Sequence, residues 1–479
     1  MQAGSLKVAL VAARAGLTRL GALGLASGLA VLVTGCGSLP TIVPDMARSR
    51  TPVQIDSARG PLSNARSRDI LAKLKLGSDA THIFDRHLAL EQAVSDSPLV
   101  EGNRIALLQD GPQTYRAMLA AIETARDHIN METFILEAGE AGDRFAEALI
   151  NKQRQGVQVN LIYDAAGSFD TPVDFITRLR DAGIRTLEFN PINPLTAKAG
   201  WNLNNRDHRK LLIVDGQTVF LGGVNISSVY LGGSLSGRFS QGSKQPSAPD
   251  QPWRDTDLQI DGPVVAEFQK LFLDTWLRQK GETLAPRNYF PPLQRQGNGV
   301  VRAIGSSPQS GVSLMYVTLL SAINSAETEV LLTNAYFVPD AQLLDALKAA
   351  AARGVNVRMV LPAKTDSTLV FHVGRSHYQE LLESGVKIYE RREAMLHAKT
   401  ALIDGVWGTV GSTNLDWRSF LHNDEVNAVV LGADFGGPMR AAFEADVAQS
   451  EQIVLEKWRS RSLDLRLKES LSRLWQYWL

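Results

Sequence analysis

The sequence predicts an α/β protein made of two pseudo-symmetric halves, each a sandwich of a mostly parallel sheet flanked by helices, with the functional site where the halves meet. Three observations predict this class. Residues 113–225 resemble residues 314–414 in outline, strand-like apolar runs alternate with helical patterns in both, and one motif of reactive residues occurs twice. A chain of 479 residues is long enough for two domains with buried cores.

The N-terminus has the pattern of a targeting segment. Three basic residues, Lys7, Arg14 and Arg19, precede the apolar run GALGLASGLAVLVTG, which ends just before Cys36, the only cysteine of the chain. The letters VTGC are similar to the lipobox of bacterial lipoproteins, whose cysteine is lipidated. By the rule of that family, Gly37 in the next position favours the outer membrane.

We therefore predict a lipoprotein signal peptide over residues 1–35 and a protein anchored in the bacterial cell envelope through lipidated Cys36, facing the periplasm at the outer membrane. A signal anchor that is not cleaved and a buried free thiol are the alternatives. Without residues 1–35 the formal charge falls from 0 to −3, so no basic surplus indicates a nucleic-acid partner. Residues 36–67 lack periodicity and are predicted to be a tether.

The first half is predicted over residues 68–280. A helical pattern from Ala120 leads into the strand-like run INMETFIL, and the next helix-to-strand steps pass through Gly156 and Gly183. The letters KLLIVDGQTVFLGG then predict a hairpin with an Asp-Gly turn. Residues 231–252 are rich in Gly, Ser and Pro and have no counterpart in the other half, so we expect a surface loop, either a lid or an inert insertion.

The second half, residues 301–450, repeats these steps after a connector over residues 281–300. A helical pattern from Ser321 leads into VLLTNAYFV, and later steps pass through Gly354 and Gly385. Alternating strands and helices in both halves are the basis for the expected parallel sheets.

The C-terminal residues 451–479 are predicted to form an amphipathic helix. A helix packed on the domain is the favoured reading, and a helix on a membrane surface fits the same pattern. The apolar positions are Leu463, Leu467, Leu471, Leu474 and Trp478, and the basic positions are Arg459, Arg461, Arg466, Lys468 and Arg473.

The repeated motif has the spacing His-x-Lys-x4-Asp-x6-Gly-x-x-Asn. Five fixed residues at this spacing arise by chance in roughly one chain of this length in ten thousand, so two copies indicate an internal repeat. The copies are His208, Lys210, Asp215, Gly222 and Asn225, and His397, Lys399, Asp404, Gly411 and Asn414.

The hairpins predict where these side chains point. A two-residue turn at Asp215 puts Gly223 opposite His208, and the same count puts Ser412 opposite His397. The histidine, lysine and asparagine of each copy then project from one face of the sheet.

This trio of side chains suits a phosphodiester. Lysine and asparagine donate hydrogen bonds to the non-bridging oxygens, a task that metal ions perform in many phosphoryl-transfer enzymes. Transfer through a covalent intermediate needs one neutral imidazole as the nucleophile and one protonated imidazole for the leaving alkoxide. Two copies facing each other supply both. No cofactor and no metal site is expected, because the other histidines lack metal-ligand spacing.

Carboxylates in three places compete for a role beside the imidazoles. The aspartates of the motif, Asp215 and Asp404, are expected to form turns rather than to take part in the chemistry. Asp255, in WRDTDLQIDG, and Glu425, in HNDEVNAVVLG, are better placed to orient an imidazole. Their neighbours, Asp257 and Asp424, are the competing assignments.

The double motif resembles the phospholipase D superfamily, whose hallmark is HxKx4D followed by G[GS]xN. The segments ETFIL, NAYFVP, GGVN and GSTNLD are most similar to its bacterial cardiolipin synthase branch, and the resemblance covers about residues 100–450. It implies two phospholipase D-like α/β domains with an active site at their interface. It also implies that His208 is the nucleophile and His397 the general acid and later the base. The residues that it implies for the phosphate are Lys210, Lys399, Asn225 and Asn414.

The implied reaction is phosphatidyl transfer through a phosphohistidine. With the hydroxyl of phosphatidylglycerol as the acceptor the product is cardiolipin, and with water it is phosphatidic acid, the product of a phospholipase D. A metal-independent nuclease uses the same motifs, but the predicted anchor and the negative charge balance oppose it. An inactive lipid-binding scaffold of the envelope is the non-enzymatic alternative, and the presence of both histidines and both lysines opposes that.

Overall fold

The computed structural model describes residues 39, 52–75, 83–95, 97–193, 201–231, 252–311 and 313–479. Residues 41–479 form one compact unit, which contains every element discussed below. The predicted signal peptide, Cys36 and all but the ends of the 231–252 insertion lie outside the described residues.

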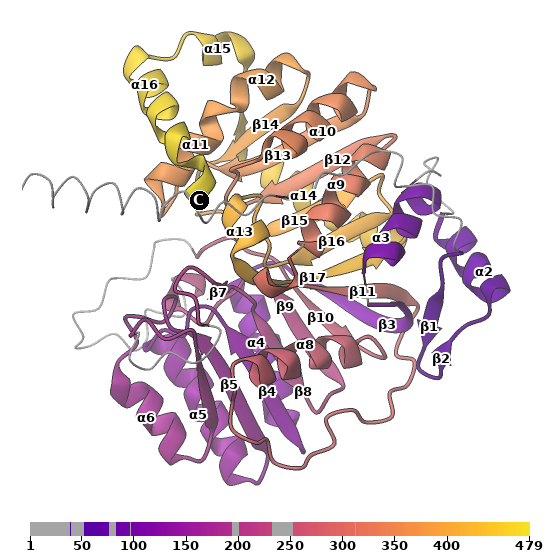
Figure 1. Cartoon of the computed structure of the whole chain (residues 1–479), viewed down its shortest axis with the longest axis vertical. Helices are drawn as coiled ribbons and strands as arrows, with labels where there is room; N and C mark the ends of the chain where they lie inside the picture. The colour runs from indigo at the N-terminus through magenta and orange to yellow at the C-terminus, as the bar shows by residue number, and fades with distance from the viewer. Residues whose placement is uncertain are drawn as a thin grey trace, which may run out of the picture. The chain divides into compact units, whose positions relative to one another are not determined.

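Both halves contain the same order of strands (Figure 1). The order is β6–β5–β4–β8–β9–β10–β3 in the first half and β14–β13–β12–β15–β16–β17–β11 in the second. The first three strands of each order are parallel, and the other neighbours are antiparallel. The first-half strands are β3 (Leu99–Leu108), β4 (His128–Thr133), β5 (Gln158–Asp164), β6 (Arg185–Phe189), β8 (Leu211–Val214), β9 (Thr218–Gly222) and β10 (Asp257–Asp261). The second-half strands are β11 (Gly299–Ser306), β12 (Glu329–Asn334), β13 (Asn356–Pro362), β14 (Lys387–Arg391), β15 (Lys399–Ile403), β16 (Trp407–Gly411) and β17 (Asn423–Leu431).

The sheet continues from one half into the other. Strand β3 pairs with β11, and the short β7 (Arg206–Asp207) pairs with the start of β17. The predicted α/β class, a large sheet flanked by helices, is confirmed, but the sheet is mixed rather than mostly parallel. The two strands of each motif hairpin reverse direction through a short turn, which only antiparallel neighbours allow, and the strand that follows each hairpin, β10 or β17, also pairs antiparallel with it.

Helices pack on both faces of the sheet, because alternate residues of one strand enter different apolar clusters. Leu212 joins the cluster beneath α4, α5 and α6, whereas Ile213 joins the cluster beneath α8 and α14. The second cluster contains buried residues of both halves, such as Phe268 and Phe443, so the halves share one core. The helices are α4 (Gly111–Thr124), α5 (Glu140–Arg154), α6 (Val173–Asp181), α8 (Val265–Arg278), α9 (Leu314–Ser325), α10 (Ala341–Ala352), α11 (Thr368–Ser376), α12 (Tyr378–Glu383), α13 (Trp417–Leu421) and α14 (Ala433–Ala448).

The N-terminal boundary differs from the prediction. The tether expected over residues 36–67 already contains structure at Ile55, which is fully buried in β1 (Ile55–Ser57) and pairs with β3. Burial of this apolar side chain stabilises the short strand, although the polar residues around it gave no strand pattern in the sequence. The other elements before β3 are β2 (Gly60–Pro61), α2 (Asn64–Lys75), η2 (Ile83–His87) and α3 (Leu88–Val94).

The C-terminal prediction of one helix over residues 451–479 is also wrong. The segment contains β18 (Ser450–Gln452), α15 (Leu455–Arg459), α16 (Leu463–Ser472) and the 3-10 turn η6 (Arg473–Trp478). Ser460 follows α15 and Ser462 precedes α16. Serine disfavours helix interiors because its hydroxyl competes for backbone hydrogen bonds, so the helix is interrupted between these residues. Within the described part of the chain, no helix is long and apolar enough to cross a membrane.

Candidate active site

The two motif hairpins place the reactive residues at the centre of the sheet. In the first, Val214 pairs with Thr218, and in the second, Ile403 pairs with Trp407. Each loop therefore has three residues rather than the predicted two, and the predicted pairing is wrong by one residue. The third loop residue, Gln217 in the first copy, donates its backbone N–H to the Val214 carbonyl at 3.0 Å and thereby completes the turn.

The motif aspartates lie in these turns, each with a φ of 52°. The Asp215 carboxylate accepts hydrogen bonds of 2.8–3.2 Å from the backbone N–H groups of Arg126, Asp127 and His128. The Asp404 carboxylate accepts equivalent bonds from residues 327–329. Each aspartate therefore connects its hairpin to the start of the neighbouring strand, β4 or β12, and it does not contact an imidazole.

Each imidazole is held by a carboxylate from the other half. His208 Nδ1 lies 3.1 Å from both carboxylate oxygens of Glu425, and His397 Nδ1 lies 2.7 Å from Asp255 Oδ2. A carboxylate that is ionised only accepts hydrogen bonds, so in that state Nδ1 of each ring is the donor and Nε2 remains for chemistry. The pairing of Asp255 with the second histidine and of Glu425 with the first joins the halves at the site.

The lysines lie directly beneath the histidines. Lys210 Nζ donates to the backbone carbonyl of His208 at 2.6 Å, and Lys399 Nζ donates to the carbonyl of His397. Both lysines are at least 98% buried. Burial, which disfavours the ammonium, lowers the pKa of Lys210 to about 7 and that of Lys399 to about 8.

The asparagines differ in what they bind. Asn225 Oδ1 accepts the backbone N–H of Ile135 at 3.0 Å, which joins the first motif to the loop after β4. Asn414 Oδ1 is buried and has no hydrogen-bond partner within the described residues. A buried amide of this kind is poised to accept or donate a bond when substrate enters.

The two imidazole–carboxylate pairs are electrostatically unequal. Burial, assisted by Lys210, lowers the pKa of His208 well below its ordinary value. Burial and Lys399 also lower the pKa of His397, but Asp255 opposes this decrease. Despite burial, the pKa of Asp255 is lowered because His397 attracts the carboxylate, whereas burial raises the pKa of Glu425 to about 7. His208 is therefore the imidazole that stays neutral more readily, and His397 is the imidazole that binds a second proton more readily.

A different small residue lies beside each of the two carboxylates, and its size suits the length of the carboxylate side chain. At Gly223 a Cβ would overlap the carboxylate of Asp255, so only glycine leaves room. In the other half, the Ser412 hydroxyl donates a hydrogen bond to Glu425 Oε2. The glycine therefore makes room for the short aspartate, and the serine helps to hold the longer glutamate.

The competing carboxylates do not reach an imidazole. Asp257 Oδ1 accepts the backbone N–H of Val224 at 3.1 Å, and burial together with Asp255 raises the pKa of Asp257 to about 8. Asp424 forms an ion pair with Arg278 at 3.0 Å. These two carboxylates bind the backbone and an arginine next to the site and do not contact the imidazoles.

Four aromatic residues surround the imidazoles. The Phe134 ring lies 5.1 Å from the ring of His208, and Tyr336 lies 6.4 Å from His397. Tyr230 and Trp253 were missed by sequence reasoning. The Tyr230 hydroxyl lies 3.1 Å from His397 Nδ1, and the Trp253 ring lies 5.4 Å from the ring of His397. Both residues flank the 231–252 insertion, and their place at the ends of a possible lid was the only sequence signal that could have indicated them.

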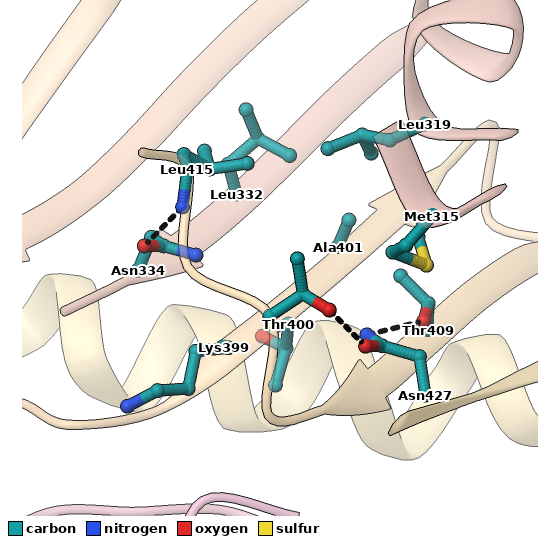
Figure 2. Close-up of a pocket in the computed structure, with 11 residues that line it drawn as sticks. Met315, Leu319, Leu332, Asn334, Lys399, Thr400, Ala401, Thr409, Leu415 and Asn427 are labelled. Carbon is teal, nitrogen blue, oxygen red and sulfur yellow. Dashed lines mark hydrogen bonds between the residues drawn. The ribbon is translucent and has the colours of Figure 1, made fainter. Parts of the chain in front are cut away.

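A small cavity lies behind the second motif. Its volume of about 20 Å³ has room for about one water molecule, so it does not hold substrate. Figure 2 shows the Lys399 side chain extending away from it, while Asn427 donates to Thr409 at 3.2 Å. Among the described residues, no group of three or more His, Cys, Asp and Glu could hold a metal ion.

A duplicated α/β fold that brings one histidine and one lysine of each repeat together is the architecture of a phospholipase D-like protein. The family model described as "Cardiolipin synthase, PLD-like domain" matches residues 118–233 and 319–447, and the chain belongs to this family.

Individual relatives agree with this assignment. The cardiolipin synthase of Geobacillus sp. (strain WCH70) is 35% identical over 390 residues, which cover 81% of this chain and 74% of the relative. That of Alkalihalophilus pseudofirmus is 34% identical over 388 residues, 80% of this chain and 74% of the relative. Among solved structures, the phosphatidylserine synthase of Haemophilus influenzae Rd KW20 has the same fold, with a TM-score of 0.62, 14% identity, and coverage of 81% of this chain and 99% of that chain.

These relatives correct the predicted location. An outer-membrane lipoprotein facing the periplasm was expected, and this prediction is wrong, because the chain matches proteins described as cardiolipin synthases over 81% of its length and neither relative is described as such a lipoprotein. The predicted location depended only on the apolar N-terminal run and Cys36, whereas the similarity to these relatives extends over most of the chain. Lipidation of Cys36 stays a sequence prediction.

Proposed function

We propose that the protein is a phosphatidyltransferase that makes cardiolipin from two molecules of phosphatidylglycerol through a phosphohistidine intermediate. The observation that carries this proposal is the pair of buried imidazoles, each held through Nδ1 by a carboxylate of the other half. One pair supplies a nucleophile and the other supplies an acid, as displacement in two steps requires. The substrate class comes from relatives described as cardiolipin synthases.

In the first step, His208 Nε2 attacks the phosphorus of phosphatidylglycerol and forms the N–P bond. The P–O bond to the head-group glycerol breaks, and His397 Nε2 protonates the departing alkoxide. In the second step, the terminal hydroxyl of another phosphatidylglycerol attacks the phosphorus while His397 takes its proton. The N–P bond breaks, His208 returns to the neutral form, and the net products are cardiolipin and glycerol.

The other residues of the site stabilise the charge on the phosphoryl group. Lys210 and Lys399 lie below the two histidines, where their ammonium groups can donate to the non-bridging oxygens. Bound phosphate is an anion, so its arrival favours the protonated form of both buried lysines. Asn225 and Asn414 add amide donors, and these interactions strengthen in a site from which water is excluded.

The experiment is to give the purified protein phosphatidylglycerol in mixed micelles and to identify the products by mass spectrometry. We expect cardiolipin and glycerol in equal amounts. Phosphatidic acid without cardiolipin would instead identify a phospholipase D, and the absence of any lipid product would contradict both enzymatic readings. His208→Asn is the matched control, because it removes the nucleophile without adding charge.

A further inference from the structure

Helix α16 and the turn η6 after it carry an apolar stripe that no described part of the chain covers. The stripe consists of Leu463, Leu467, Leu471, Leu474 and Trp475, which are 54–80% exposed. The first three are spaced four residues apart on α16 and therefore lie on one face. Large apolar side chains gathered in this way mark an interaction surface, unlike single leucines scattered over a protein.

The opposite side of α16 is the side that packs on the protein. Glu469 is 2% exposed and forms an ion pair with Arg461 at 2.7 Å. Leu467 and Leu471 lie two residues before and after Glu469, which is roughly 200° around a helix. Helix α16 lies against α11 (Figure 1), so the packed helix expected from the sequence is present, but it packs through its polar side.

We propose that this stripe docks the protein on an anionic phospholipid surface. This proposal rests on the proposed function, in that the substrates are lipids. Charge complementarity supports it, because residues 459–473 hold five basic and two acidic side chains. Arg459, Arg461 and Lys468 form ion pairs with carboxylates, and the exposed Arg466 and Arg473 carry the remaining positive charge. Long basic side chains can lie along an apolar surface while their charges reach phosphate groups.

Charge also argues against a second copy of the chain as the occupant. In a symmetric dimer the same patch of each copy meets itself. The basic residues around both stripes would then be brought together, and like charges across an interface oppose association. A surface of anionic lipid neutralises the same charges.

The stripe is connected to the active site by two routes. Helix α11, on which α16 rests, begins two residues after Asp366, whose carboxylate accepts hydrogen bonds of 2.6 and 2.7 Å from the Tyr336 hydroxyl. The Tyr336 ring faces His397. At the chain end, the Leu479 carbonyl accepts the backbone N–H of Arg418, on the helix that follows the second motif, at 3.2 Å. The docking stripe is therefore linked through packed elements to the tyrosine ring beside His397 and to the helix after the second motif.

A depth measurement tests insertion regardless of how the N-terminus attaches. The full chain with Cys36→Ser and Leu467→Cys carries a nitroxide at position 467 and is added to vesicles of phosphatidylglycerol and phosphatidylcholine. We expect the label to become several-fold more accessible to oxygen than to a water-soluble nickel complex. The matched control is Leu277→Cys on α8, 73% exposed, which should stay accessible to the nickel complex. Equal nickel accessibility at both positions would overturn the proposal.

A kinetic measurement separates docking from chemistry. The double variant Leu467→Glu and Leu471→Glu should lose at least about tenfold in kcat/KM on vesicles, because two leucines proposed to enter the lipid are replaced by charges. It should keep its activity on short-chain monomeric phosphatidylglycerol. Unchanged activity on vesicles, or a change of oligomeric state with no insertion of the label, would contradict docking on lipid. Failure of the proposed function would instead appear as no activity on either substrate with insertion intact.

Discussion

The first half holds His208 against Glu425, and the second half holds His397 against Asp255, so equivalent imidazoles face carboxylates of different length. The longer glutamate has a pKa raised to about 7 by burial, whereas the aspartate has a lowered pKa because His397 attracts it. An ionised partner favours imidazolium, and a partner that is partly protonated does not. The two halves thus contain similar frames with different carboxylates, and this difference supports the proposed division into a neutral nucleophile, His208, and an acid, His397.

The histidines give the sharpest test of this division. His208→Asn and His397→Asn should each reduce turnover of phosphatidylglycerol by at least about a thousandfold, since nucleophile and acid both act in the first step. With phosphatidyl-p-nitrophenol, whose leaving group needs no proton, His397→Asn should still release about one equivalent of p-nitrophenol per enzyme in a burst. His208→Asn should release none. A burst from His208→Asn and none from His397→Asn would reverse the assignment.

The carboxylates should respond differently to pH. Asp255→Asn should lower kcat by about a hundredfold or more at both pH 6 and pH 8, because Asp255 is ionised throughout this range and fixes the tautomer of His397. Glu425→Gln should have little effect at pH 6, where Glu425 is mostly neutral, and should cost about tenfold or more at pH 8, where the carboxylate is ionised.

Kinetics of both variants across pH 5.5 to 8.5 provide the measurement. The ratio of wild-type to Glu425→Gln activity should rise through about pH 7, and the ratio for Asp255→Asn should stay flat. Parallel curves for the two variants would mean that the carboxylates are equivalent.

The neighbours of the carboxylates should show a smaller contrast. Gly223→Ala places a Cβ where the Asp255 carboxylate lies, so we expect a loss of about tenfold or more in kcat and a lower melting temperature. Ser412→Ala removes one hydrogen bond to Glu425 without adding volume and should cost only about threefold to tenfold. Thermal melts beside the kinetics distinguish crowding from loss of the bond, and an alanine tolerated better at position 223 than at position 412 would contradict this account.

The motif aspartates are where the halves should behave alike. Asp215→Ala and Asp404→Ala each leave three backbone N–H groups without their acceptor, and each should lower the free energy of unfolding by about 1–3 kcal/mol. The kcat of the protein that remains folded should change by less than about threefold. Urea unfolding followed by circular dichroism measures the first quantity, and a large loss of kcat without a loss of stability would give these aspartates a chemical role.

Much of the fold could be predicted because its signals are local. The α/β repeat follows from the alternation of apolar strands and Ala-rich helices, and each Asp-Gly pair marks its hairpin turn. The error of one residue in the register arose because a third residue, Gln217, joins the turn, and side-chain periodicity alone does not count loop residues. The mixed direction of the sheet was missed for a related reason, since direction depends on which strands become neighbours.

The C-terminal segment illustrates the same limit. Its apolar spacing was visible in the sequence, but the spacing fits both a helix buried on the domain and one that faces outward. The burial of Glu469, on the side of α16 that packs on the protein, decides the orientation, and that burial exists only in the folded chain. Sequence periodicity therefore predicted an amphipathic helix without predicting which face is covered.

The identity and spacing of the histidines, lysines and asparagines are written along the chain twice, so the class of chemistry could be inferred from the letters alone. The exchange of Asp255 and Glu425 between the halves could not, because each carboxylate pairs with an imidazole 142 or 217 residues away, and no pattern along one strand encodes a contact at that separation. Only the packing of the two halves against each other creates the two unequal imidazoles. Tyr230 and Trp253 reach His397 for the same reason, since the fold brings the ends of the insertion to the site.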